Sequence, residues 1–171
     1  KKIKCKYLIL PFLEKSNFSE IKYKDISFIK EISSELKNNN IVLCIESLSS
    51  GVYLKKIFER IGDENIKCVF DSGNRVYLDK NFYEDIIELK DLIAHVHLKD
   101  KDSNNNNVLL GSGNVNFYKL FENLEKINYK GNFVFETYRG VNPIQTAEFN
   151  MFFCKFFINQ ITSNSVNVKY V

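Results

Sequence analysis

The chain has 171 residues, 44% of them hydrophobic, with few Pro and Gly, a composition typical of one globular domain and not of a disordered segment. Its net charge is +3 with acids and bases interspersed, and this mild balance argues against nucleic acid or a membrane surface as a partner. No apolar run approaches the roughly 20 residues that span a bilayer, and the sequence shows no signal-peptide pattern.

The four cysteines lack the CxxC spacing of a metal or redox motif. Cys44 and Cys68 fall inside apolar runs, where a thiol serves as a small hydrophobic side chain. Unpaired cysteines are typical of a reducing compartment, so we expect a cytoplasmic protein. The chain begins at Lys1 and not at a methionine, and we expect an upstream portion to be missing from it.

The first half of the chain alternates between strand and helix patterns. An apolar run over Cys5–Leu10, ended by Pro11, predicts a strand, and residues 12–24 predict a long polar loop. Asp25 is placed to cap a helix, which the sequence Asn38–Asn40 ends. The apolar positions of two amphipathic helices follow helical spacing: Ile26, Ile29, Ile32 and Leu36 in the first, and Leu54, Ile57, Phe58 and Ile61, stopped by Gly62, in the second.

The second half continues this alternation. Ser72–Arg75 predicts a tight turn, and the polar run Lys101–Asn107 predicts a mobile loop. Gly111–Gly113 leads into a helix, and the tail from Ser163 predicts a frayed end or a short edge strand. Apolar residues at helical spacing mark three further helices: Phe82, Ile86 and Leu89; Phe117, Leu120, Phe121 and Leu124; and Phe149, Phe152, Phe153, Phe156 and Phe157. We expect the last phenylalanine stripe to belong to the core and not to a cofactor site.

Each of four short apolar runs is followed by a side chain that can bind a metal ion. They are Ile41–Ile45 before Glu46, Ile66–Phe70 before Asp71, Ile93–Val96 before His97, and Phe133–Phe135 before Glu136. Five predicted strands alternate with helices, and no turn between them is short enough for an antiparallel hairpin. We therefore predict right-handed βαβ units and a parallel sheet. Active sites of such sheets lie at the carboxyl ends of the strands, where these four side chains fall.

The run Ile93–Asp100 contains both histidines of the chain, His95 and His97. In a strand, residues i and i+2 share a face, and His97, nearer the carboxyl end, can reach a site there. Alone, this pattern fits a metal ligand and an ordinary half-buried histidine equally well. The carboxylates at the neighbouring strand ends favour the metal site, with His95 in a supporting or structural role.

The order and spacing of these motifs resemble the sugar phosphate isomerase/epimerase family, the xylose-isomerase-like (β/α)8 barrel group that also includes endonuclease IV. The resemblance rests on Glu46 after IVLCI, Asp71 in FDSGN, His97 in HVHLKD, LGSGNVNF at 110–117 and Glu136 in FVFETYRG. Such a barrel has eight strands in about 250 residues, and the five predicted strands match the last five. The resemblance implies an α/β fold, a parallel (β/α) barrel of the TIM type with only its C-terminal five units, forming one N-terminally incomplete domain over residues 1–171.

In that family a Glu, an Asp, a His and a second Glu hold one divalent metal ion. By motif, the resemblance assigns these roles to Glu46, Asp71, His97 and Glu136. Three carboxylates and one imidazole form an oxygen-rich set that suits Mn²⁺ first, with Mg²⁺, Co²⁺ or Zn²⁺ as alternatives.

The resemblance implies a divalent-metal-dependent sugar or sugar phosphate isomerase or epimerase of carbohydrate metabolism, with a dehydratase as a variant on the same scaffold. Abstraction of a proton next to a carbonyl creates an enediolate, whose charge a metal ion stabilises. Glu46 and Glu136 are the expected catalytic pair that removes and returns the proton.

Three further residues are candidates for substrate binding. The family usually places a His three residues after the metal Asp, but this chain has Asn74, which can hydrogen-bond the substrate and cannot titrate. Lys99, like Asp100, can contact the substrate or lie in a solvated loop. Arg139 can bind a phosphate or carboxylate of the substrate. Gly111–Gly113 can form an anion site or simply precede a helix.

Two other function classes stay open. The missing barrel half favours a non-catalytic or incomplete relative that acts in binding or assembly. An AP endonuclease like endonuclease IV is disfavoured, because that enzyme carries an Asp-x-His where Lys101–Val108 contains no histidine. An open five-stranded sheet would expose apolar edges around Cys5–Leu10 and Phe133–Phe135. The expected partners are therefore a small-molecule sugar and a second copy or an N-terminal barrel half, with no nucleic acid and no membrane.

Overall fold

The computed structural model describes residues 4–13, 21–79 and 81–165 as an α/β fold on a five-stranded sheet of order β1–β2–β3–β4–β7. These strands span Tyr7–Phe12, Val42–Ser47, Ile66–Asp71, Ile93–Leu98 and Asn132–Phe135. Every neighbouring pair is parallel, because helical segments connect successive strands and return the chain to the same end of the sheet. The predicted parallel α/β architecture is confirmed.

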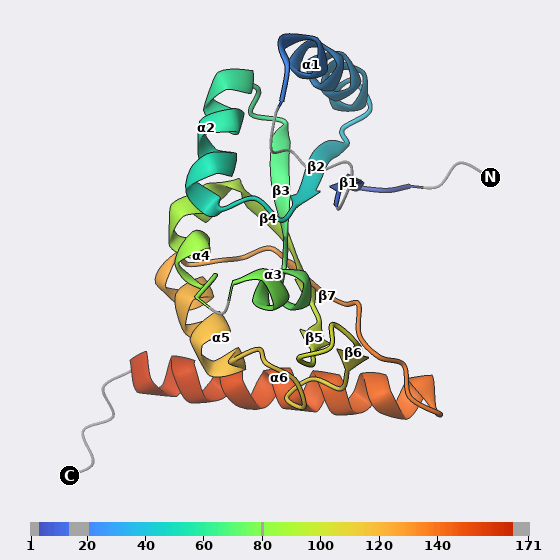
Figure 1. The fold of residues 1–171 in the computed structure, drawn as a ribbon, viewed down its shortest axis with the longest axis vertical. Coiled ribbons are helices and arrows are strands. Elements are labelled where there is room, and N and C mark those ends of the chain that lie inside the picture. The colour runs from blue at the N-terminus through green and yellow to red at the C-terminus, as the bar shows by residue number, and fades with distance from the viewer. Residues whose placement is uncertain (1–3, 14–20, 80, 166–171) are drawn as a thin grey trace.

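The helices cover one side of this sheet. They are α1 (Tyr23–Lys37), α2 (Gly51–Ile61), α3 (Ser72–Leu78), α4 (Glu84–Leu89), the single 3₁₀ turn Lys90–Leu92, α5 (Phe117–Lys126) and α6 (Pro143–Ser165). Helices α2, α4, α5 and α6 pack each against the next and form a curved wall (Figure 1). The fold is thus a partial TIM-type barrel, with parallel strands inside and helices outside.

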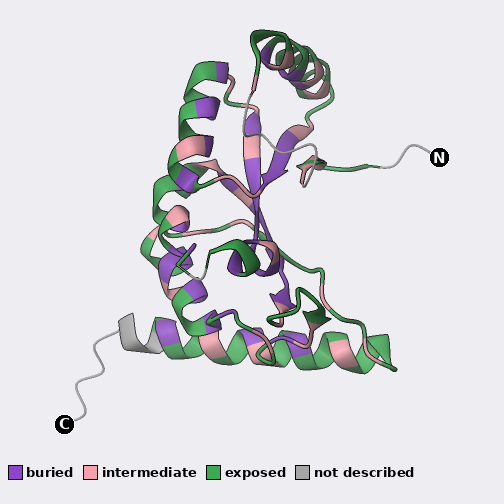
Figure 2. Ribbon diagram, viewed as in Figure 1, coloured by how far each residue is buried: buried purple, intermediate pink, exposed green. Residues whose placement is uncertain are grey.

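The three middle strands β2, β3 and β4 are buried on both faces (Figure 2), which explains their nearly continuous apolar sequences. Alternate residues face opposite sides, so Leu43 and Ile45 join the core beneath the helices, whereas Cys44 and Glu46 face the inner side of the sheet. The metal-binding candidates therefore share the inner face and the carboxyl end of the sheet.

Two predictions about the N-terminal part need correction. The first strand continues through Pro11 to Phe12, which is tolerated because β1 is an edge strand, the position in a sheet where proline is found. Helix α1 begins before Asp25, whose Oδ2 accepts a hydrogen bond of 2.9 Å from the backbone N–H of Lys22. Most of the loop predicted at residues 12–24 lies outside the described residues.

Two further loop predictions need correction. Ser72–Arg75 is the first turn of α3 and not an isolated tight turn. The polar segment Lys101–Asn107 joins two short antiparallel strands, β5 (Asp100–Lys101) and β6 (Asn107–Val108). The side chain of Asp102 orders the connecting turn by accepting hydrogen bonds from two backbone N–H groups in it. Repeated asparagines here form a hairpin, which the sequence pattern did not reveal.

The phenylalanine stripe of α6 is split between core and surface. Phe153 and Phe157 pack against the core, but Phe149, Phe152 and Phe156 are 46%, 72% and 51% exposed, so the prediction that the stripe belongs to the core holds for only part of it. Helix α6 also continues to Ser165 where a frayed end was predicted, and residues 166–171 lie outside the described part.

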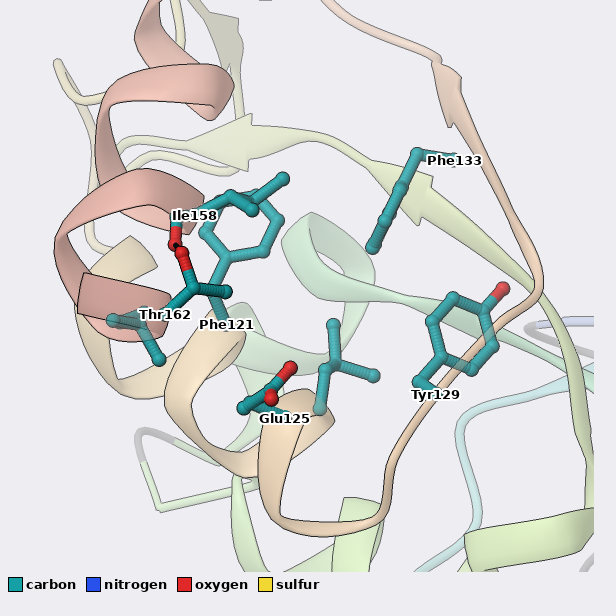
Figure 3. A pocket seen from close by; sticks show the side chains of 8 residues that line it. Phe121, Glu125, Tyr129, Phe133, Ile158 and Thr162 are labelled. Carbon is teal, nitrogen blue, oxygen red and sulfur yellow. Dashed lines mark hydrogen bonds between the residues drawn. The ribbon is translucent and has the colours of Figure 1, made fainter. Parts of the chain in front are cut away.

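Strand β7 at the edge of the sheet is poorly covered, as predicted. Phe133, Val134 and Phe135 are 39%, 40% and 37% exposed, and Leu8 on the opposite edge strand is 38% exposed. A pocket of about 90 Å³ also lies between α5, β7 and α6, with the rings of Tyr129 and Phe133 on one side (Figure 3). The junction of β7 with α6 is therefore incompletely packed.

All four cysteines lie within the described residues and are free thiols. Burial raises the pKa of Cys44 to about 11 and those of Cys68 and Cys154 to about 12, so these thiols are un-ionised and act as apolar side chains. Among the helices that the structure describes, none is long and apolar enough to cross a bilayer.

We expect this chain by itself to self-associate through the exposed aromatic side of α6, because exposed apolar patches of this kind drive association. The double substitution Phe152→Ser/Phe156→Ser should shift the sedimentation coefficient toward the monomer value. Phe28→Ser, which removes a comparably exposed phenylalanine (61%) from α1, is the matched control and should leave the distribution unchanged. Equal sedimentation of all three chains would contradict the expectation.

Candidate metal centre

A β-bulge places the histidine of the candidate site. Cys68 pairs with Ile93, but the next residue Val69 pairs with His95, so β4 carries one extra residue. The shift brings His97 directly opposite Asp71. Because the side-chain period of a strand is two, the regular register would have put His97 out of line with Asp71. The bulge therefore aims the imidazole at the carboxylates.

Glu46, Asp71 and His97 form a buried cluster whose candidate ligand atoms all lie within 4.8 Å of one another. Nδ1 of His97 lies 3.6 Å from Oδ2 of Asp71 and 3.8 Å from Oε2 of Glu46. Glu136, just past β7, brings its Oε2 to 2.8 Å from the same nitrogen. The structure thus places the three predicted carboxylate ligands around Nδ1 of the fourth predicted ligand, His97.

The carboxylates differ in their exposure to solvent. The side chains of Glu46 and Asp71 are 8% and 2% exposed, whereas that of Glu136 is 52% exposed. One face of the cluster is therefore closed by the protein and the Glu136 face is open, as a site that admits a small molecule requires.

Lys99 supplies a positive charge inside the cluster. Its Nζ lies 3.1 Å from Oδ2 of Asp71 and 3.0 Å from Oε1 of Glu136, and its side chain is 6% exposed. The backbone of Lys99 is fixed by Ser72, whose Oγ donates to its carbonyl (2.7 Å) and accepts from its N–H (3.0 Å). A Cβ on Gly73 would lie 2.5 Å from Cγ of Lys99, so glycine leaves the space for the lysine stem. The alternative of a solvated loop at Lys99 is wrong.

The pKa values reflect this crowding of charge. Burial, together with the charge of Asp71, raises the pKa of Glu46. Burial would lower the pKa of His97, but contact with Asp71 and the charges of Glu46 and Glu136 outweigh it and raise that pKa. Burial likewise would lower the pKa of Lys99, but Asp71 and Glu136 raise it and keep the ammonium charged. The carboxylates thus favour the positively charged forms of His97 and Lys99.

The donor atoms fit a divalent cation. Oδ2 of Asp71 and Nδ1 of His97 are buried and have no aligned hydrogen bond, although charged groups lie near both. Buried polar atoms without such bonds are rare unless a water or an ion serves them. Two carboxylates and an imidazole facing one another, with a third carboxylate beside them, can supply the ligands of a hard or borderline divalent ion.

Asn74 is positioned by Asp71 and reaches Glu46. Oδ1 of Asp71 caps α3 by accepting from the backbone N–H of Asn74 at 2.7 Å, and Nδ2 of Asn74 donates to Oε1 of Glu46 at 3.1 Å. The residue expected to bind substrate thus holds one of the candidate ligands instead. This arrangement fixes the rotamer of Glu46, and binding of a substrate by Asn74 stays a prediction.

Arg75 fixes the loop that follows Glu46. Its guanidinium is 3% exposed and donates to the carbonyls of Ser47 (3.0 Å) and Ser49 (3.3 Å), and it forms a 2.7 Å ion pair with Asp85. Asp85 in turn accepts a hydrogen bond of 2.6 Å from the N–H of Gly51. Sequence analysis missed this role because the loop residues lie 26 and 28 positions away from Arg75.

Asp100 is a fully buried anchor and not part of a solvated loop. Its two carboxylate oxygens accept four backbone hydrogen bonds of 2.9–3.0 Å, from Lys101, Gly111, Gly113 and Val115. Burial raises the pKa of Asp100, and these N–H groups lower it. The candidate anion site at the glycine turn is therefore filled by the protein's own carboxylate. A side chain on Gly113 would collide with Oδ1 of Asp100.

The remaining predicted residues lie beside the cluster. The ring of His95 packs edge-on against that of His97, with centroids 5.2 Å apart, and against Tyr7 at 5.7 Å. Burial, and secondarily the charge of His97, lowers the pKa of His95, in keeping with a supporting role. Arg139 is exposed and lines a cavity that also includes Glu136.

We expect Asp100→Asn to destabilise the fold by about 3 kcal/mol, because an amide nitrogen replaces an acceptor that faces two backbone N–H groups. Asp102→Asn makes the same change in the exposed hairpin and should cost much less. Urea unfolding of both variants measures the difference. Equal midpoints would show that the Asp100 carboxylate does not organise the glycine turn.

We expect Mn²⁺ affinity to rise with pH and to continue rising above pH 6.5, histidine's ordinary pKa. A metal ion must displace the proton on His97, whose pKa is raised, so protons compete with metal until the pH passes that value. Titration followed by the electron paramagnetic resonance signal of free Mn²⁺ measures this. His97→Gln should bind more weakly and lose the dependence above pH 6.5. An affinity of the unaltered chain that is constant between pH 6.5 and 8 would contradict the assignment.

Comparisons with known proteins support the fold. The structure superposes on a xylose isomerase domain protein from Planctomyces limnophilus with a TM-score of 0.78 at 18% identity, covering 93% of this chain and 62% of that one. The structure of an L-ribulose 3-epimerase superposes with a TM-score of 0.75 at 16% identity, and the match covers 86% of this chain and 57% of that one. The structure of the IolI protein with a zinc atom superposes with a TM-score of 0.67 at 16% identity, and the match covers 95% of this chain and 65% of that one. At these identities the likeness shows the fold alone.

Two uncharacterized proteins of Methanocaldococcus jannaschii are similar in sequence. MJ1311 is 28% identical over 133 residues, and the match covers 71% of this chain and 45% of that protein. MJ1614 is 33% identical over 75 residues, and the match covers 43% of this chain and 28% of that protein. The chain thus matches less than half the length of either relative. The family described as the xylose isomerase-like TIM barrel matches residues 20–153, and the chain belongs to this family.

Proposed function

We propose that this chain carries the metal-binding and proton-transfer residues of a divalent-metal-dependent sugar isomerase or epimerase. The observation that carries the proposal is the convergence of three carboxylates from three strand ends on Nδ1 of His97, at 2.8, 3.6 and 3.8 Å. Membership of the xylose isomerase-like family supports it, and so do neighbours of the same fold that are named as L-ribulose and D-psicose 3-epimerases.

Glu46, Asp71, His97 and Glu136 would hold the metal ion. Their oxygen-rich set favours Mn²⁺, with Mg²⁺ or Co²⁺ next, and the zinc atom of the IolI protein keeps Zn²⁺ among the candidates. When bound, the ion supplies a Lewis acid for the negative charge that develops on a substrate as a proton leaves carbon.

The two glutamates are suited to different parts of the proton transfer. Glu46 is buried, its pKa is raised, and Asn74 fixes Oε1, so its carboxylate is a stronger base than an exposed one. Glu136 is half exposed, so its carboxylate can exchange a proton with water. Lys99, between Asp71 and Glu136, is placed to donate a hydrogen bond to a substrate oxygen that displaces one of these carboxylates.

The proposal also covers the cellular location of the protein and two alternative functions. The free thiols support the expected cytoplasmic location. The structure offers little support for an endonuclease IV-like activity, because that enzyme uses three metal ions, and the described residues contain one group suited to a metal. A binding or assembly role without turnover is the competing proposal, favoured by the exposed apolar residues of β7.

We expect Glu136→Gln to lose turnover while largely keeping its affinity for Mn²⁺, because glutamine keeps a coordinating oxygen and cannot accept the proton. Exchange of the carbon-bound proton of L-ribulose or D-psicose with deuterated solvent, followed by NMR, is the direct assay. Glu148→Gln, an exposed glutamate on α6, is the matched control and should exchange like the unaltered chain.

The outcomes separate the two proposals. Exchange that falls at least 100-fold in Glu136→Gln alone, as loss of a general base produces, supports the isomerase or epimerase. Mn²⁺ binding without exchange in the unaltered chain favours the binding or assembly role. Unchanged exchange in Glu136→Gln would remove this residue from the mechanism.

A further inference from the structure

A cavity of about 440 Å³ opens beside the metal cluster, between the segment after β7 and the first two turns of α6. Its volume lies within the range of small-molecule sites, about 300–1,000 Å³. Glu136 belongs to its lining and also contacts His97 and Lys99. The cavity and the metal cluster therefore adjoin each other at Glu136.

The cavity carries one unpaired positive charge. Glu136 and Arg139 are its charged lining residues, and the carboxylate of Glu136 is already engaged by His97 and Lys99. Arg139 forms no ion pair with any residue that the structure describes. The positive end of the 23-residue α6 faces the same space, although Asn142 already accepts from the N–H groups of Ile144 and Gln145. The positive charge of Arg139 and of the helix end is therefore complementary to an anionic group on a ligand.

Asn150, one of the residues that line the cavity, carries a buried hydrogen-bond acceptor without a partner. Asn150 is 1% exposed, its Nδ2 donates to Oγ1 of Thr137 at 3.0 Å, and its Oδ1 is buried with no hydrogen bond. A buried amide oxygen in this state costs free energy, which a donor from a ligand would recover. A hydroxyl group is such a donor, and an anion is not.

We propose that this cavity binds the far end of the substrate, which is a hydroxylated chain ending in an anionic group, a phosphate or a carboxylate. Arg139 pairs with the anionic group, and Oδ1 of Asn150 accepts a hydrogen bond from a neighbouring hydroxyl. The inference rests on the proposed function in placing the reacting carbon at the metal cluster, but binding in the cavity itself needs no metal. It narrows the substrate class from sugars in general to acidic sugars or sugar phosphates.

The test compares three small probes that share a three-carbon hydroxylated skeleton: glycerol 3-phosphate, glycerate and glycerol. Binding to the full chain is followed by NMR in the presence of a chelator, with the side-chain amide of Asn150 as the local reporter. We expect one or both anions to bind at least 10-fold more tightly than glycerol and to shift the Asn150 signals. The better of the two identifies phosphate or carboxylate as the terminal group.

The variants decide whether Arg139 is responsible. Arg139→Gln should weaken anion binding at least 10-fold, and Arg139→Lys should weaken it less, because the charge remains and the bidentate geometry is lost. Lys155→Gln removes the same charge from an exposed position farther along α6 and should bind like the unaltered chain. Equal loss in Arg139→Gln and Lys155→Gln, or binding that leaves the Asn150 signals in place, would overturn the proposal.

A separate Mn²⁺ titration of Arg139→Gln keeps this inference distinct from the proposed function. Unchanged Mn²⁺ affinity with lost anion binding supports a separate site for the substrate's far end. Anion binding at Arg139 in a chain that fails to bind Mn²⁺ would refute the metal proposal and leave the anion site standing. Loss of both in this variant would show that Arg139 supports the fold of the cluster, and the inference would then be wrong.

Discussion

The repulsion among the carboxylates at the strand ends is the constraint on which the site depends. Glu46 and Asp71 are buried side by side, and Glu136 joins them at the open face. Like charges this close are unfavourable in a medium that excludes water, unless cations stand between them. His97 and Lys99 occupy that position in the structure. The same arrangement that keeps the cluster folded also prepares it for a divalent ion, which would take over part of their electrostatic role.

Two buried charged residues next to the cluster fix the loops at the carboxyl end of the sheet. Asp100 gathers the glycine turn with four backbone hydrogen bonds, and Arg75 ties the loop after Glu46 to Asp85. Both anchors are buried charges with several partners, the condition under which such a charge is tolerated. Neither touches the candidate ligands, yet each limits where the neighbouring backbone can go. The geometry of the centre is therefore a property of the whole carboxyl end of the sheet.

The strands and the candidate ligands could be predicted from the sequence, because an apolar run ending on a polar side chain is a local pattern, and parallel topology gathers such ends at one edge. The burial of Lys99 could not, because it depends on the space left by Gly73 and on partners from two other strands. The exposure of Phe152 was mispredicted for a related reason. Helical spacing shows which residues share a face, but not whether any neighbour covers that face. The bulge that aligns His97 leaves no signature in residue type.

The position of Arg139 shows how one segment can serve two parts of a ligand. The chain leaves β7 at Glu136, which faces the cluster, and three residues later presents a free cation to the adjoining cavity. A ligand that satisfied both would be fixed at its reacting end and at its far end, and such two-point fixation is what positions a carbon for proton transfer. In the proposed binding mode Asn150 would add a direction that charge alone lacks, because a hydrogen bond to its Oδ1 requires a correctly placed donor on the ligand. The open end of the sheet thus combines a cation at Arg139 with the carboxylates of the metal cluster, an arrangement suited to a ligand that has an anionic end and a metal-binding end.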